Sequence, residues 1–177
     1  AEQFTRCAMT DPRTPALVAH GATYKPAQVT QGQAYWRLVE AHGPLQMGGR
    51  HHIYVDVLGE AGQRLSGIPV KFFWADGDTL TRTEPKPGEP AATNFPMFAG
   101  GNAYGCRVDS GLPSDELFGM GLVPFMPHVS YRLIFKRTLA GGDAPPQEPP
   151  KPPPSNVDLE YALDQMQYWL DIAKGKL

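Results

Sequence analysis

Apolar and polar residues alternate in short runs along residues 35–138. In the clearest run, residues 52–58, the apolar side chains of Ile53, Val55 and Val57 are separated by polar or aromatic ones. A period of two residues is typical of a strand that buries one face. The tetrapeptide Gly-Glu-Ala-Gly follows this run directly, and its turn-forming residues predict that the strand ends there.

Further runs repeat this pattern along the chain. They span Tyr35 to Ala41, Ile68 to Trp74, Tyr104 to Val108 and Val129 to Phe135, with weaker ones around Leu80 and from Leu117 to Val123. The run that ends at Trp74 follows the clearest run after one turn, so we expect these two strands to pair as a hairpin. Residues 34–139 therefore predict an all-β domain, an antiparallel Ig-like or prealbumin-like β-sandwich of about seven strands.

The segments outside this region have different patterns. Residues 1–33 show neither a strand nor a helix period, and we interpret them as an irregular N-terminal arm. Residues 140–154 contain a proline-rich tract, which predicts a polyproline II stalk. Residues 155–177 predict an amphipathic helix, whose apolar stripe could not be satisfied alone in water. We expect this stripe to form a partner interface, by self-association or with another protein, through Leu159, Leu163, Met166, Trp169 and Leu170.

Composition narrows the classes of function. The net charge is −2 and only 19% of residues are charged, so no basic field attracts nucleic acid. No apolar run is long enough to predict a membrane span. The chain has two cysteines, Cys7 and Cys106, which are either one disulfide or two separate buried thiols. We predict the disulfide because they are the only two cysteines of a chain that we expect to be exported.

The sequence offers little that predicts catalysis or metal binding. The nucleophile motif GxSxG and the zinc motif HExxH are both absent from the sequence. His51 and His52 are adjacent on a strand, so their side chains point to opposite faces and do not share one ion. The acidic residues Asp109, Asp115 and Glu116 are the one loop cluster worth naming, and we interpret them as turn residues around a proline. We therefore predict no enzyme activity, no cofactor and no metal site.

A binding surface has more support. In the clearest strand, His52, Tyr54 and Asp56 alternate with the apolar residues and should point outward. If the hairpin forms, Lys71 and Phe73 share that outward face. Aromatic rings flanked by polar groups suit a sugar, whose apolar C–H faces stack on rings, and they also suit a protein partner or a covering arm.

The central region also resembles a known kind of module. The resemblance rests on GRHHIYV from Gly49, LGEAGQRLSGIPV from Leu58, NFPMF from Asn94, LPSDELFGMGL from Leu112 and HVSYRLIFKRT from His128. These segments resemble a secreted β-sandwich module, of the carboxypeptidase-regulatory-like or Ig-like kind, in cell-wall-associated proteins of Chloroflexota-type bacteria. The resemblance implies a sandwich fold and an accessory role outside the cell or on its surface. It implies neither a catalytic residue nor a particular ligand.

Two functions of different classes follow from these observations. The first is a non-catalytic extracellular module that binds a cell-envelope glycan or a surface partner. The alternative is a structural subunit of a surface filament or virion-like assembly, held together by the arm and the C-terminal helix. The outward aromatic residues favour the first, and the apolar stripe of the helix favours the second.

Overall fold

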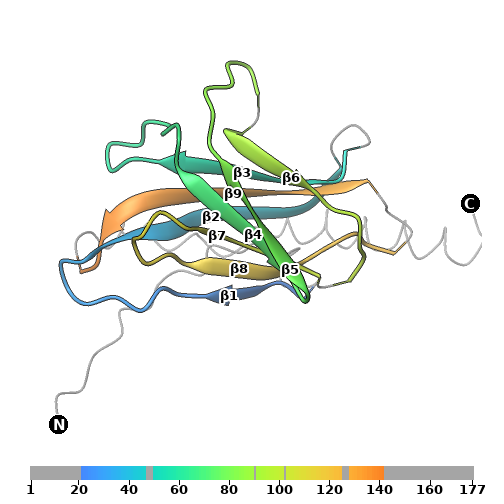
Figure 1. Cartoon of the computed structure of the whole chain (residues 1–177), viewed down its shortest axis with the longest axis horizontal. Helices are drawn as coiled ribbons and strands as arrows, with labels where there is room; N and C mark the ends of the chain where they lie inside the picture. The colour runs from blue at the N-terminus through green and yellow to red at the C-terminus, as the bar shows by residue number, and fades with distance from the viewer. Residues whose placement is uncertain (1–20, 47–49, 90, 102, 125–127, 142–177) are drawn as a thin grey trace, which may run out of the picture. The chain divides into compact units, whose positions relative to one another are not determined.

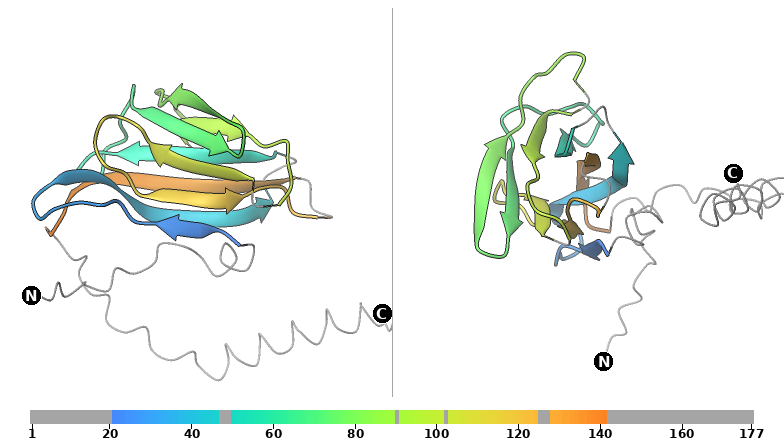
Figure 2. Two further views of the ribbon diagram at one scale, coloured as in Figure 1. Left: turned by 60° about the horizontal axis from the view of Figure 1, so that its bottom comes forward. Right: turned by 90° about the vertical axis from the view of Figure 1, so that its right-hand side faces the viewer.

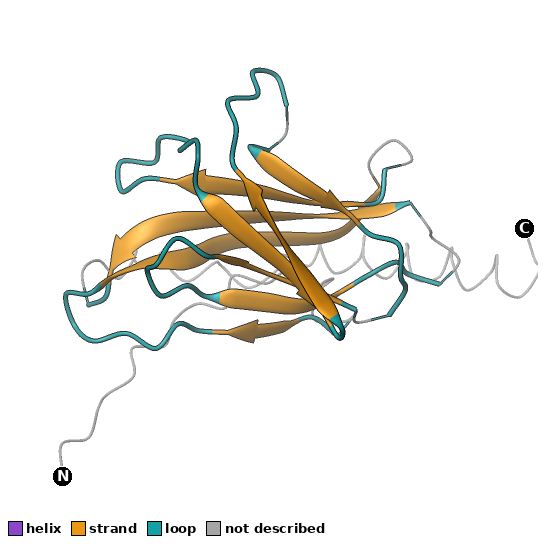
Figure 3. Cartoon of the chain, in the orientation of Figure 1, coloured by secondary structure: helices purple, strands orange, loops and turns teal. Residues whose placement is uncertain are grey.

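The computed structural model describes residues 21–46, 50–89, 91–101, 103–124 and 128–141, and all regular elements in this part are strands (Figures 1 and 3). They are β1 Thr23–Lys25, β2 Ala34–Gln46, β3 His52–Leu58, β4 Pro69–Trp74, β5 Gly77–Arg82, β6 Thr93–Pro96, β7 Tyr104–Val108, β8 Glu116–Met120 and β9 Val129–Leu139. The predicted all-β fold is confirmed for this part of the chain.

The strands form two sheets. One has five strands in the order β1-β8-β7-β4-β5, and the other has four in the order β2-β9-β3-β6. The right-hand view of Figure 2 shows the two layers facing each other. The Ig-like or prealbumin-like type within this class stays a prediction.

The core lies between the inner faces of the two sheets. Ile53, Val55 and Val57 of β3 are fully buried, as their alternation predicted. Val70 and Phe72 of β4 are fully buried from the opposite sheet and belong to the same apolar cluster. Each such side chain stabilises the fold by about 1.5–3 kcal/mol when it leaves water, so this alternation is the main reason that the two sheets associate.

The predicted hairpin between the second and third long strands is wrong. β3 and β4 belong to different sheets, with β3 between β9 and β6 and β4 between β7 and β5. After β3 the chain first folds back on it, because the Leu65 amide donates to the Val57 carbonyl at 2.8 Å. It then crosses to the other sheet, where the Ile68 amide donates to the Thr83 hydroxyl at 2.9 Å. Alternation marks the buried face of a strand but does not determine its neighbour.

The prediction of a purely antiparallel sandwich is also wrong. β3 and β9 are parallel, in a register that runs from Ile53 opposite Tyr131 to Leu58 opposite Lys136. Parallel neighbours need a long connection, and here the chain passes through five other strands between them. The four-stranded sheet is therefore mixed.

The predicted boundaries need one correction. Residues 23–25, which we assigned to an irregular arm, form β1 and pair with β8 at the edge of the five-stranded sheet. Ala22 is buried beside them. Residues 1–20 of the predicted arm, residues 142–154 of the stalk and the helix at 155–177 with its apolar stripe all lie outside the described residues.

Candidate functional site

The outer face of the five-stranded sheet carries a row of charged side chains. Register places Lys25 of β1 opposite Glu116 of β8, then Arg107 of β7 and Lys71 of β4. Glu116 joins its neighbours, since it accepts from Lys25 Nζ at 3.3 Å and from Arg107 Nη1 at 2.8 Å. Lys71 forms a further ion pair with Asp78 of β5 at 2.9 Å. This face therefore carries both signs of charge, with the two cations Arg107 and Lys71 side by side.

A second row of residues on the same face, two residues away along each strand, carries aromatic side chains. It runs from Phe118 of β8 across Gly105 of β7 to Phe73 of β4. A Cβ atom at Gly105 would overlap the ring of Phe73 and lie 3.0 Å from the Cβ of Phe118. The Phe73 ring therefore lies over the glycine, and Phe118 keeps 39% of its surface exposed. We name Lys25, Lys71, Phe73, Gly105, Arg107, Glu116 and Phe118 the outer platform.

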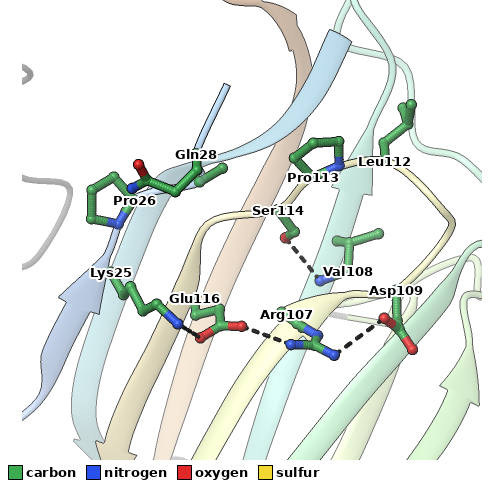
Figure 4. A pocket seen from close by; sticks show the side chains of 11 residues that line it. Lys25, Pro26, Gln28, Arg107, Val108, Asp109, Leu112, Pro113, Ser114 and Glu116 are labelled. Atoms are coloured by element: carbon green, nitrogen blue, oxygen red, sulfur yellow. Dashed lines mark hydrogen bonds and ion pairs between the residues drawn. The ribbon is translucent and has the colours of Figure 1, made fainter. Parts of the chain in front are cut away.

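Two hollows adjoin the outer platform. The larger, of about 440 Å³, includes Lys71, Phe73 and Asp78 in its lining. The smaller, of about 270 Å³, lies between the loop after β1 and the loop after β7, and Figure 4 shows its side chains. Both hollows are open, and both are lined by Lys25, Arg107 and Glu116. A ligand longer than one small group could therefore contact both.

The buried carboxylate of Asp115 holds one wall of the smaller hollow in place. Asp115 has no exposed surface and accepts hydrogen bonds of 2.8 Å from the Tyr24 hydroxyl and from the amides of Ala27 and Leu38. These bonds tie the loop after β1 to β2 and β8. Burial raises the pKa of Asp115, although the three donors oppose that shift. Our interpretation of Asp115 as a turn residue was therefore incomplete, because the residue joins three segments of the chain.

The pKa of Glu116 is shifted in the direction opposite to that of its neighbour Asp115. Partial burial by itself would raise the pKa of Glu116, but the hydrogen bonds from Arg107 and Lys25 outweigh it and hold that pKa below its usual value. The carboxylate form is thus favoured, and Glu116 stays paired with Arg107 and Lys25 at neutral pH.

The structure does not assemble the binding surface that the sequence predicted. His52, Tyr54 and Asp56 lie on the four-stranded sheet, whereas Lys71 and Phe73 lie on the other one. Tyr54 and Asp56 do face away from the core, but they keep only 3% and 2% of their surface exposed. Lys71 and Phe73 remain part of a candidate site, on the outer platform.

Loops and neighbouring side chains explain why those residues are buried. Asp56 forms an ion pair with Arg64 Nε at 2.8 Å and accepts from the Ala92 amide at 3.0 Å. The segments that carry these groups therefore enclose the Asp56 carboxylate. His52 stacks on the ring of Tyr54 with centroids 5.6 Å apart, and burial lowers the pKa of His52. Asp56 and Tyr54 are thus structural residues in this arrangement.

The alternation along one predicted strand already indicated two residues of the outer platform that the sequence analysis did not select. Tyr104, Cys106 and Val108 recur at every second position of one predicted strand and are buried, so Gly105 and Arg107 between them face outward. What the sequence lacked was the order of the strands, which brings Glu116 and Phe118 beside them.

Three further predictions concern the disulfide, metal binding and a membrane-spanning segment. Cys106 is a buried thiol, and its predicted partner Cys7 lies outside the described residues, so the disulfide stays a prediction. Among the described residues, no group of three or more His, Cys, Asp or Glu side chains is arranged to hold a metal ion. The same part of the chain holds no helix with the length and apolar character to cross a bilayer.

No known protein family, curated protein or solved structure matches the chain.

Proposed function

We propose that this chain is a non-catalytic binding module of the cell surface, which takes an envelope glycan on the outer platform. The observation that carries the proposal is the aromatic row beside the charged row, over two hollows that share three lining residues. The extracellular location is proposed from the sequence resemblance alone.

The chemistry of the two rows suits a sugar chain. The ring of Phe73, and the exposed part of Phe118, offer apolar surfaces on which the C–H face of a pyranose can stack. Beside them, Arg107, Glu116 and Lys71 supply donors and acceptors for hydroxyl, amide or carboxylate groups. The cations of this face are paired with the carboxylates of Glu116 and Asp78, which does not suit a polyanion such as nucleic acid, because that requires a basic surface.

Binding should be measured with the full chain, against purified insoluble cell-wall fractions by co-sedimentation and against an oligosaccharide panel by calorimetry. A stacked ring contributes about 0.5–1.5 kcal/mol, so Phe73→Ala should weaken binding by about 2- to 12-fold. Phe118→Ala, at a more exposed position, tests the same row with less risk to the fold. Leu139→Ala is the matched control, because Leu139 is similarly exposed, at 46%, but lies on β9 of the other sheet.

Two results would contradict the proposal. One is a wild-type chain that binds no wall fraction and no oligosaccharide. The other is a Phe73→Ala variant that keeps its fold, by circular dichroism and melting temperature, and binds as tightly as the Leu139→Ala control.

A further inference from the structure

The edge strand β5 presents an open row of backbone hydrogen-bonding groups. Among the strands of the described residues, β5 pairs with β4 and is the last one of its sheet. The hairpin of β4 and β5 forms the bright-green rim in the right-hand view of Figure 2. An edge of this kind can accept a further strand, by the same hydrogen bonds that join strands within a sheet.

The register shows which groups of β5 point away from the sheet. A two-residue turn joins Trp74 to Gly77, so this pair closes the hairpin with hydrogen bonds, as do the pairs of Thr79 and Thr81 with β4. Pro69 has no amide hydrogen and lies opposite Arg82, which agrees with this alternation. The amides and carbonyls of Asp78, Leu80 and Arg82 therefore face outward from the edge.

The side chains of the same three residues are exposed. Asp78, Leu80 and Arg82 point to the outer face, while Thr79 and Thr81 between them are half-buried. Leu80 keeps 52% of its surface exposed. Single exposed leucines are common, but this one lies at the middle of an open edge and has a charged residue at equal distance on each side.

When two copies of β5 run antiparallel, each side chain lies opposite one that suits it. Residues 78–82 read Asp-Thr-Leu-Thr-Arg. Two copies that run antiparallel about a two-fold axis at Leu80 place Asp78 of each copy opposite Arg82 of the other. Thr79 then lies opposite Thr81, and Leu80 lies opposite Leu80 of the second copy. Opposite charges in such cross-strand positions stabilise a sheet, and an isologous contact of this kind closes a dimer.

We propose that β5 is a dimerisation edge, at which two copies of this chain pair antiparallel in the register centred on Leu80. The outward groups of Asp78, Leu80 and Arg82 then form roughly six backbone hydrogen bonds with the second copy, two for each directly bonded pair. The two five-stranded sheets become one continuous sheet. Asp78 can keep its ion pair with Lys71, which joins the strand on its other side.

This dimer would also place two outer platforms on one face of the continuous sheet. Phe73 lies opposite Asp78 in the present sheet, so Phe73 of one copy comes into the same cross-strand row as Arg82 of the other. The inference does not depend on glycan binding, because it rests on the β5 edge alone. A bivalent surface would nevertheless strengthen binding to a repetitive polymer.

The first test inverts charges in the full chain and follows its mass by sedimentation velocity across a wide concentration range. Asp78→Arg places two arginines opposite each other, at two symmetric positions, and Arg82→Asp does the same with two acids. We expect each single variant to weaken dimerisation by about tenfold or more. The double variant restores both opposite pairs, so its dimerisation should return towards that of the wild type.

The second test reads the register directly by cross-linking. In the proposed dimer the two Leu80 Cα atoms are about 5.5 Å apart, a distance that suits a disulfide. In a background with Cys7→Ser, mild oxidation of Leu80→Cys should give a covalent dimer on a non-reducing gel. Leu139→Cys is the matched control, because this position is similarly exposed but is placed on β9.

Three results would overturn the proposal. They are a wild-type chain that stays monomeric at all concentrations, self-association that the single charge inversions leave unchanged, and equal cross-linking of Leu80→Cys and Leu139→Cys. The second result would point instead to the helix predicted for residues 155–177 as the contact. Melting temperatures of all variants separate a lost contact from a lost fold.

Discussion

Removing the carboxylate of Asp115 should detach β1 and the loop after it from the sandwich. Asp115→Ala leaves the amides of Leu38 and Ala27 without their acceptor and removes the bond from the Tyr24 hydroxyl, each at 2.8 Å. A buried donor without an acceptor costs about 1–3 kcal/mol, and Leu38 is 1% exposed. With the lost Tyr24 bond, we expect the free energy of unfolding to fall by about 3–5 kcal/mol.

Urea unfolding followed by tryptophan fluorescence measures this change. For a domain of this size, such a loss lowers the melting temperature by about 10–20 °C. Hydrogen exchange should show the greatest loss of protection at residues 22–27. Asp109→Ala is the matched control, because Asp109 is an acid in the same part of the chain with 41% of its side chain exposed. We expect that control to change stability by less than about 0.5 kcal/mol. Equal stabilities of the two variants would refute the reasoning.

Two further predictions concern charge and close packing. The pKa of Glu116 is held below its usual 4.5, so the stability that this shift contributes is present above that pH and is lost as the pH falls through the lower folded value. Glu116→Gln should therefore flatten the loss of stability below about pH 4.5 in urea titrations, and an unchanged pH profile would contradict this expectation. At Gly121, a Cβ would overlap the carbonyl oxygen of Gly101, whereas at Gly59 it would meet only a flexible glutamine side chain. We expect Gly121→Ala to cost about 1–3 kcal/mol and Gly59→Ala clearly less, as measured by thermal unfolding, and the reverse order would count against the packing described.

The candidate site could be predicted only in part. Lys71 and Phe73 were identified from the alternation of one strand, and they lie on the outer platform. Their predicted companions Tyr54 and Asp56 also face away from the core, but Arg64 and the Ala92 amide bind Asp56, and the ring of His52 stacks on Tyr54. Alternation is a property of one strand, so it cannot show which loops return over that strand.

The sequence by itself determined the buried face of the strands with the clearest alternation. Ile53, Val55 and Val57, and likewise Val129 and Phe135, are buried because strand geometry alternates faces at every residue and the apolar side chains must leave water. These local rules need no knowledge of distant residues. They were sufficient to predict an all-β fold with two packed layers.

Only the tertiary structure decided which strands are neighbours, and with them the site. The parallel contact of β3 with β9 and the place of β4 in the other sheet depend on how the connecting loops cross between sheets. The same is true of Glu116, which meets Arg107 and Lys25 only because β8 lies between β7 and β1. The apolar faces of all these strands are chemically alike, so burial alone leaves many strand orders almost equal in free energy. Particular contacts, such as the bonds to the buried Asp115, can distinguish among these orders, and they form only when distant segments meet.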